Sequence, residues 1–244
     1  MEMNPMHQFE VYRIGPEIKL GGVNLSFTNA SLFMTISSIT ILLLLFFGTK
    51  KKSLIPSKLQ LVTEMGYTFI AKMINDTAGP SAKPFFPFIF TLFMFVLFCN
   101  MIGMLPYSFT VTSHIIVTFM LAATVFIGVT IIGFIKHGIK YLELFVPKGV
   151  PIILLPLIIV IEIISYLSRP VSLSVRLFAN MMAGHTMLKV FGGFVISLGL
   201  LGGWLPLSFS VALTGLEILI AFLQAYVFAI LTCIYLNDAL NLHH

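Results

Sequence analysis

Apolar residues along this chain gather in long runs that are separated by short clusters of lysine. The first run covers residues 32–48, and two further runs cover residues 84–105 and 114–135. Because a helix needs about 20 mostly apolar residues to cross the hydrocarbon of a bilayer, each run predicts one membrane-crossing helix. A short turn around Pro106 and Ser108 joins the second run to the third, which predicts a tight hairpin.

The segment between the first two runs has an amphipathic pattern. From Pro56 to Asp76 apolar residues recur at helical spacing. The predicted apolar face holds Ile55, Leu59, Val62, Phe69 and Met73. The residues that lie elsewhere are Lys58, Glu64, Thr68 and Lys72. This pattern is typical of a helix that lies along the membrane surface.

From Val150 to Leu240 the apolar sequence continues almost without a break, but polar and charged residues now occur inside it. They are Glu162, Ser165, Arg169, Arg176, Asn180, His185, Lys189, Glu217, Gln224 and Asp238. Ionisable groups inside a membrane segment usually face a bundle interior or water, and they mark the path of an ion or a substrate. We therefore expect the function to reside in this third of the chain.

The number of crossings in this last third depends on two interruptions, Pro170 and the glycine-rich stretch at residues 191–206. Either two or three crossings fit the pattern. Two long helices, tilted or kinked at Pro170, give about five crossings in all and a C-terminus on the lysine-rich side. The predicted fold class is thus all-α: a polytopic membrane protein with about five crossing helices and one interfacial amphipathic helix.

Composition agrees with a membrane protein, because 58% of the residues are hydrophobic and only 9% are charged. The net charge of +5 does not indicate nucleic-acid binding, since the lysines lie in clusters between the apolar runs. The loops on either side of the hairpin hold Lys50, Lys51, Lys52, Lys58, Lys72, Lys83, Lys136, Lys140 and Lys148. The hairpin turn holds none. By the positive-inside rule, the lysine-rich loops lie in the cytoplasm or matrix and the N-terminus lies outside.

Two further sequence features limit the function. The cysteines Cys99 and Cys233 lie far apart without metal-site spacing, so neither a metal nor another cofactor is expected. The first 29 residues contain acidic residues and prolines and resemble neither a cleaved signal nor a transit peptide. We expect insertion of the chain as written, from a bacterial gene or an organelle genome.

The polar residues of the last third could handle protons. On a regular helix Ser172, Arg176 and Asn180 form one stripe, since they are spaced four residues apart. Buried carboxyl groups and imidazoles can exchange protons near neutral pH, whereas arginine keeps its charge. Glu162 on one side, and His185 with Glu217 on the other, would then form two half-paths separated by the fixed positive charge of Arg176.

Two structural alternatives stay open at this point. A polar network that only locks helix packing explains Glu162, His185 and Glu217 about equally well. Arg176 could instead be the partner of Glu217 or Glu162 in an internal ion pair.

Four stretches resemble one family. RLFANMMAGH, at residues 176–185, resembles the arginine helix of subunit a of F-type, proton-translocating ATP synthases. LEILIAFLQAYVFAILTCIYL, at residues 216–236, resembles that family's last helix, whose glutamine stands near the arginine. HQFE and LSFTNASLFM, at residues 7–10 and 25–34, are similar to the start of subunit a in alphaproteobacteria and mitochondria. The resemblance covers nearly the whole chain.

The resemblance implies a non-catalytic stator subunit that presses against a ring of c subunits, each of which carries one membrane-embedded carboxylate. Arg176 would face that ring, keep the passing carboxylate ionised and prevent a proton short circuit. His185 and Glu217 match a pair in the half-channel that opens to the outside, with Asn180 and Gln224 beside them. Many bacterial relatives carry the reverse pairing of Glu and His at these two positions, which is consistent with a relay between neighbours.

The resemblance also covers the other half-channel. Glu162 and Ser165 match positions on the side of the catalytic head, and Asp238 has a counterpart in some relatives whose side stays open. A single membrane domain over residues 1–244 follows: residues 1–29 lie outside, residues 30–149 form scaffold helices and residues 150–244 form the proton-pathway helices.

The implied function is to couple proton flow to rotation and ATP synthesis. Expected partners are the c ring, b-type peripheral-stalk subunits, the soluble catalytic head reached through the stalks, and the lipid bilayer, but no nucleic acid. The expected location is the bacterial inner membrane, with the mitochondrial inner membrane as the alternative. A secondary transporter with an intramembrane ionisable site is the alternative function, although the two halves of the chain do not resemble each other. An intramembrane hydrolase is disfavoured, since Ser165 and His185 lack a third partner.

Overall fold

The structure, a computed structural model, describes residues 9–16, 19–20, 23–24, 26–50, 56–105, 108–146 and 154–241. Its helices are α1 (Asn29–Lys50), α2 (Lys58–Ala78), α3 (Phe86–Gly103), α4 (Ile115–His137), α5 (Leu155–Gly202) and α6 (Trp204–Leu240). Short elements connect them: strands β1 (Lys19–Leu20) and β2 (Val23–Asn24), and 3₁₀ helices η2 (Pro80–Phe85), η3 (Val111–Ser113) and η4 (Gly138–Phe145). The topology residues Lys51, Lys52 and Lys148, together with Ile55 and Pro106, lie outside the described residues.

Five helices of the described chain are long and apolar enough to cross a membrane: α1, α3 with η2, α4 with the start of η4, α5 and α6. The prediction of an all-α fold with five crossing helices is therefore confirmed, and the chain is a multi-pass membrane protein. The last third forms two long helices rather than three crossings, because α5 continues as a helix through Pro170.

Helix α2 is not among the five. Of its predicted apolar face, Leu59 and Val62 are about half exposed, so they are free to contact lipid, whereas Met73 is buried. Ile70 and Ile74 are also buried, because α2 packs against α1, α3 and α6. A location along the membrane surface stays a prediction.

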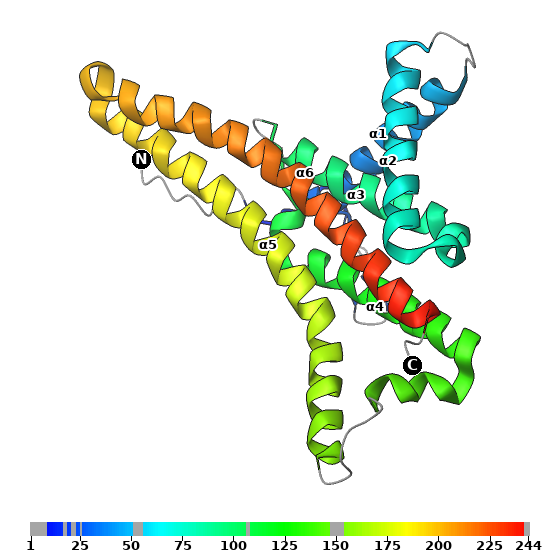
Figure 1. Cartoon of the computed structure of the whole chain (residues 1–244). Helices are drawn as coiled ribbons and strands as arrows, with labels where there is room; N and C mark the ends of the chain where they lie inside the picture. Colours follow the sequence, from blue (N-terminus) through cyan, green and yellow to red (C-terminus); the bar gives the residue numbers. More distant parts are fainter. Residues whose placement is uncertain are drawn as a thin grey trace.

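The two C-terminal helices are much longer than a bilayer is thick. Helix α5 runs for 45 residues from Leu155 to a kink at Gly199, and α6 has 37 residues. They measure about 70 Å and about 55 Å, against about 30 Å of hydrocarbon. Figure 1 shows α5 bending part-way along its length, and Pro170 lies inside it. Helices of this length fit within the hydrocarbon only when they are steeply tilted, and the tilt itself stays a prediction.

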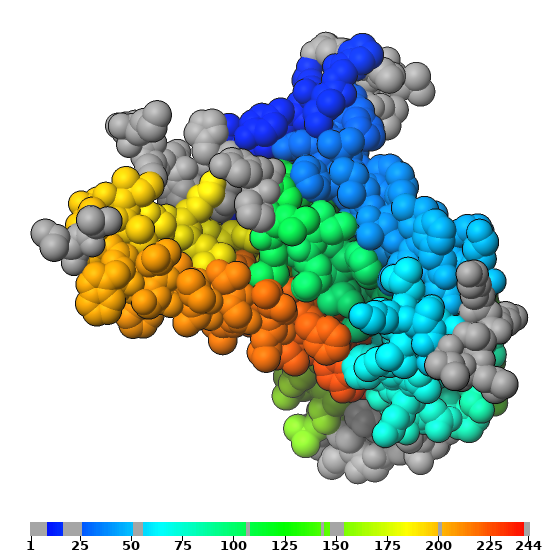
Figure 2. All heavy atoms as spheres, turned by 90° about the horizontal axis from the view of Figure 1, so that it is seen from above, coloured from blue at the N-terminus to red at the C-terminus, as the bar shows by residue number. Residues whose placement is uncertain are grey.

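Helix α6 is the centre of the bundle, because it contacts α2, α3, α4 and α5. Its residues Ala221, Ala225 and Ala229 are fully buried at four-residue intervals. Small residues on one face let neighbouring membrane helices approach closely. Figures 1 and 2 show α5 and α6 as a hairpin, yellow to orange, that projects from the other helices, with the green segment between α3 and α4 against its base.

Candidate functional site

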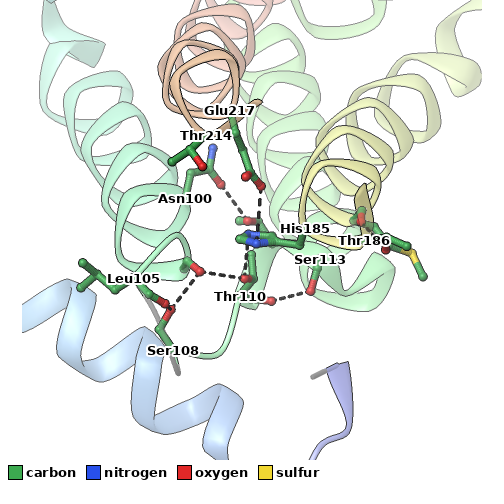
Figure 3. A network of polar contacts seen from close by, with 12 residues as sticks. Asn100, Leu105, Ser108, Thr110, Ser113, His185, Thr186, Thr214 and Glu217 are labelled. Atoms are coloured by element: carbon green, nitrogen blue, oxygen red, sulfur yellow. Dashed lines mark hydrogen bonds and ion pairs between the residues drawn. The ribbon is translucent and has the colours of Figure 1, made fainter. Parts of the chain in front are cut away.

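A cluster of polar side chains lies where the α5–α6 hairpin meets the loop between α3 and α4. The imidazole of His185 on α5 stands between two partners (Figure 3). Its Nδ1 is 3.4 Å from Oε1 of Glu217 on α6, and its Nε2 is 3.0 Å from Oγ1 of Thr110 in the loop. The structure thus brings together His185 and Glu217, which are 32 positions apart in the sequence.

Glu217 is almost fully buried, with 3% of its surface exposed. Neither of its carboxyl oxygens has a hydrogen-bond partner among the described residues, because the contact with His185 has ion-pair distance but not hydrogen-bond alignment. A buried carboxyl group without hydrogen bonds is costly, so such a group calls for an explanation beyond packing. Release and uptake of a proton is the chemistry that this carboxyl group and the adjacent imidazole can perform.

The close approach of Glu217 to α5 depends on a glycine. A Cβ atom placed on Gly184 would lie 2.8 Å from Oε1 and 3.1 Å from Cδ of Glu217. Any larger residue at position 184 would therefore displace the carboxyl group from the imidazole on the neighbouring residue.

The loop beside this pair is polar but buried. Thr112 donates a hydrogen bond from Oγ1 to Oδ1 of Asn100 over 2.7 Å, and Asn100 Nδ2 donates to the carbonyl of Ala221 over 3.1 Å. Ser113 Oγ donates to the carbonyl of Thr110 over 2.6 Å. These bonds fix the loop against α6 about one turn from Glu217.

Asn100, Thr110 and Ser113 were not identified as functional residues from the sequence. A row of Thr and Ser between two apolar runs is typical of an exposed turn. The one available signal was that this turn lacks Lys and Arg, which does not distinguish a buried turn from an exposed one.

His114 adds a second histidine at this end of the molecule, just before α4 begins. Its ring stacks on Phe109 with 4.9 Å between the ring centroids. Its Nε2 is buried without a hydrogen-bond partner among the described residues. Burial lowers the pKa of this imidazole.

Arg176 lies on the outer face of α5. Its side chain is exposed, whereas Leu173 and Leu177 of the same helix are buried. Within the described part of the chain, neither Glu217 nor Glu162 lies within ion-pair distance of Arg176. The geometry therefore does not support an internal ion pair for this arginine.

The ion pair on α5 belongs to the other arginine. Arg169 donates from a terminal nitrogen to Oδ2 of Asp238 over 3.0 Å. Its guanidinium carbon also lies 5.3 Å from the ring centroid of Tyr166 and 5.0 Å from that of Tyr235. Asp238 thus has a partner that the sequence did not predict.

The remaining predicted residues stand apart from these two clusters. Glu162 is half-buried and Ser165 is exposed, both on the part of α5 that precedes Pro170. Asn180 and Gln224 are half-buried on α5 and α6, between the His185–Glu217 contact and the Arg169–Asp238 contact along the hairpin. The described residues contain no group of three His, Cys, Asp or Glu that could hold a metal ion.

Comparison with known proteins gives consistent matches. A family model described as "ATP synthase A chain" matches residues 31–237. The chain is 79% identical over 244 residues to ATP synthase subunit a of Pelagibacter ubique (strain HTCC1062), covering 100% of both chains. It is 57% identical over 250 residues to ATP synthase subunit a of Chelativorans sp. (strain BNC1), again covering 100% of both. It is 59% identical over 247 residues to the subunit a of Rhizobium rhizogenes (strain K84 / ATCC BAA-868), covering 99% of this chain and 98% of the relative.

Proposed function

Because this chain belongs to the ATP synthase A chain family, we propose that it is the stator of the membrane sector of an F-type ATP synthase. In this role it provides two proton half-channels and presents Arg176 to the ring of c subunits. Proton flow through the half-channels is coupled to rotation of the ring and to ATP synthesis in the soluble catalytic head. The chain itself is not catalytic.

The observation that carries the proposal is the exposure of Arg176 without an ion-pair partner among the described residues. An arginine at the centre of a membrane helix costs about 2.5–3.5 kcal/mol on insertion scales. That cost is offset when a carboxylate of a partner faces the guanidinium. A c subunit with one membrane-embedded carboxylate is such a partner, and its place is on the outer face of α5.

The spacing along α5 supports two separate half-channels. Arg176 is nine residues from His185, or about 13 Å along a helix, and 14 residues from Glu162, or about 21 Å. The His185–Glu217 pair lies beside the hairpin loop that the lysine distribution assigns to the outside. Glu162, with Ser165, belongs to the opposite end, and Asn180 and Gln224 line the approach to Arg176.

The proton path then has three steps. A proton from the outside passes Glu217 and His185 and neutralises a ring carboxylate. The neutral carboxyl group can rotate through lipid, where an ionised one would be heavily penalised. On reaching the Glu162 side it gives up its proton, and each charge moved through roughly 100 mV supplies about 2.3 kcal/mol.

Partners and location follow from the same assignment. The c ring, b-type peripheral-stalk subunits and the catalytic head, reached through the stalks, complete the complex. The bacterial sources of the relatives favour a bacterial inner membrane over a mitochondrial one.

Cross-linking tests which face of α5 meets the ring. Ser172 is exposed one turn before Arg176, whereas Ser174 is 1% exposed, so Ser172→Cys and Ser174→Cys form a matched pair. In a complex whose c subunits carry a cysteine beside their carboxylate, we expect oxidative cross-links to Ser172→Cys and none to Ser174→Cys. The native Cys99 and Cys233 are buried and do not compete. Equal or reversed yields would place the ring on another face and refute the proposed role of Arg176.

A glycine substitution tests the outside half-channel. We expect Gly184→Ala to lower ATP-driven proton pumping by about 10- to 100-fold, because displacing a reacting group by about 1 Å has effects of this size. Gly192→Ala on the same helix is the control, since a Cβ there meets no atom within 4 Å. Assembly should survive in both, because alanine favours helix more than glycine does. Equal pumping by the two variants would show that the Glu217–His185 distance does not matter.

A further inference from the structure

The two arginines of α5 have the same helical register but different surroundings. Arg169 and Arg176 are seven positions apart, which places them on nearly the same face of a straight helix. Arg176 is exposed, whereas the side chain of Arg169 is only 22% exposed and is paired with Asp238. The fold therefore gives Arg169 a partly buried site with a counter-ion and leaves Arg176 exposed.

Arg169 is held from three directions. Asp238 accepts its hydrogen bond, Tyr166 from the preceding turn of α5 lies on one side, and Tyr235 from α6 contributes a second ring. Contacts of a guanidinium with aromatic faces are attractive and grow stronger away from water. This arrangement removes Arg169 from the outer face of α5.

Hydrogen bonds fix the ring of Tyr166 in turn. Thr130 on α4 donates its proton to the carbonyl of Phe126 over 2.7 Å, so Thr130 Oγ1 must accept from the Tyr166 hydroxyl at 2.6 Å. The Tyr166 oxygen can then accept from the Tyr141 hydroxyl at 3.1 Å. This chain of hydroxyls ends at a backbone carbonyl, which cannot pass a proton on. It is suited to hold Tyr166 in place rather than to conduct protons.

Two other basic side chains at this end of α6 contact a backbone carbonyl. Lys136 Nζ and His137 Nε2 lie 3.0 Å and 3.1 Å from the carbonyl oxygen of Leu240. The charge of Lys136 is favourably placed at the C-terminal end of the α6 dipole. Among the described residues, Arg169 is the cation that forms an ion pair with Asp238.

We propose that Asp238 is a fixed counter-ion of Arg169 rather than a carrier of the translocated proton, and that Tyr166 positions Arg169 for this pairing. The proposal rests on the proposed stator function and revises the role that the family resemblance implied for Asp238. Arg176 then remains the uncompensated arginine of α5.

The physical reason lies in the position of Arg169 between Arg176 and Glu162. Without a counter-ion, Arg169 would add a second fixed positive charge about 10 Å along the helix from Arg176. It would attract an ionised ring carboxylate away from Arg176 and repel the proton that is released toward Glu162. The guanidinium of Arg169 always keeps its charge, but the ion pair with Asp238 compensates that charge. Arg169 then no longer competes with Arg176 for the ring carboxylate.

A charge-neutral double variant separates a counter-ion from a carrier. We expect Asp238→Asn to lower ATP-driven pumping of the assembled complex by about tenfold, because it leaves Arg169 uncompensated. The double variant Arg169→Gln/Asp238→Asn removes both charges, and we expect it to restore pumping to within about threefold of the native complex. If Asp238 carries protons, the double variant stays as low as Asp238→Asn, and this result overturns the proposal.

The positioning role of Tyr166 has its own readout. We expect Tyr166→Ala to reduce pumping in the native background but to have no further effect in the charge-neutral background, since no arginine is left to position. Tyr166→Phe, which keeps the ring and loses the hydroxyl, should fall between Tyr166→Ala and the native residue. A residue needed only for packing would lower pumping equally in both backgrounds, contrary to the proposal.

A measurement on the native complex does not depend on the assembly of any variant. A hydrophobic carbodiimide modifies carboxyl groups that carry a proton within the membrane. We expect peptide mass spectrometry of this chain to find Glu217 modified and Asp238 unmodified. Modification of Asp238 at a rate comparable to that of Glu217 overturns the counter-ion role. Failure of the stator function itself would appear separately, as native-level pumping by an Arg176→Ala complex.

Discussion

Replacement of Arg176 by alanine is expected to lower ATP-driven proton pumping by at least about 100-fold in a complex that still assembles. Two unit charges about 4 Å apart attract by about 4 kcal/mol at an effective dielectric constant of about 20. Since about 1.4 kcal/mol corresponds to a factor of ten, loss of this attraction removes almost three orders of magnitude of preference for the ionised ring carboxylate. Assembly should persist because Arg176 is exposed and has no ion-pair partner within the described part of this chain.

The measurement is proton flux in vesicles that contain the purified complex, with ATP-driven pumping and passive leak recorded separately. Lys72→Ala is the control, since it removes an exposed cation from α2, which lies outside the five crossing helices. The control should pump like the native complex. An increased passive leak in Arg176→Ala would show in addition that the guanidinium separates the two half-channels. Native pumping by Arg176→Ala would falsify its role as the charge that faces the ring.

The second large effect is expected for Glu217→Gln, which should lower both pumping and proton-driven ATP synthesis by about 100-fold. The amide has nearly the same shape as the carboxyl group but cannot exchange a proton, and loss of one positioned acid or base typically costs about 10²–10⁴-fold. The side chain is 3% exposed and accepts no hydrogen bond among the described residues, so the substitution breaks no such bond.

Glu64→Gln provides the matched control for Glu217→Gln, because Glu64 lies on α2 and accepts a hydrogen bond from Gln60. The rate of ATP-driven pumping and the rate of proton-driven ATP synthesis are both measured relative to the amount of assembled complex. The exchanged pair His185→Glu/Glu217→His should recover part of the activity, since an acid and an imidazole still face each other. If Glu217→Gln pumped normally, the cluster around His185 would be a packing network, and the outside path would run elsewhere.

The packing alternative makes a different prediction for every residue of that cluster. A network that only locks helices would lose assembly when Asn100 or Thr112 is replaced, and flux per assembled complex would not change. A relay loses flux while assembly persists. Recording both quantities therefore separates the two interpretations with one set of vesicles.

Much of the architecture was accessible from the sequence, for reasons that are local. Whether a run such as residues 114–135 crosses a bilayer depends on its length and hydrophobicity, and both are properties of the run alone. The bend of α5 likewise lies in a helix whose interior contains Pro170, a residue whose ring disrupts helical hydrogen bonding. These features were predicted correctly before any contact was known.

The pairing of Arg169 with Asp238 could not be predicted from the sequence. The hydrophobic pattern alone does not distinguish Arg169 from Arg176 as the arginine with a partner inside the chain, since both lie on an apolar helix seven residues apart. Asp238 pairs with Arg169 because the antiparallel packing of α6 on α5 brings them level, beside the ring that Thr130 and Tyr141 hold in place. The burial of Ile70 and Ile74 on α2 likewise depends on contacts with neighbouring helices.

The sequence by itself determined that this is a multi-pass membrane protein of the ATP synthase A chain family, and it identified the polar residues of the last third. The structure decided that this third forms two long helices and not three crossings. The tertiary structure alone decided that Thr110 reaches His185, that Glu217 fits against Gly184 and that Arg176 is left exposed. Crossing a membrane is a property of each helix separately, because the bilayer acts on every segment alike. Which polar groups meet depends on the relative rotation and depth of several packed helices, and no spacing within one helix encodes that arrangement.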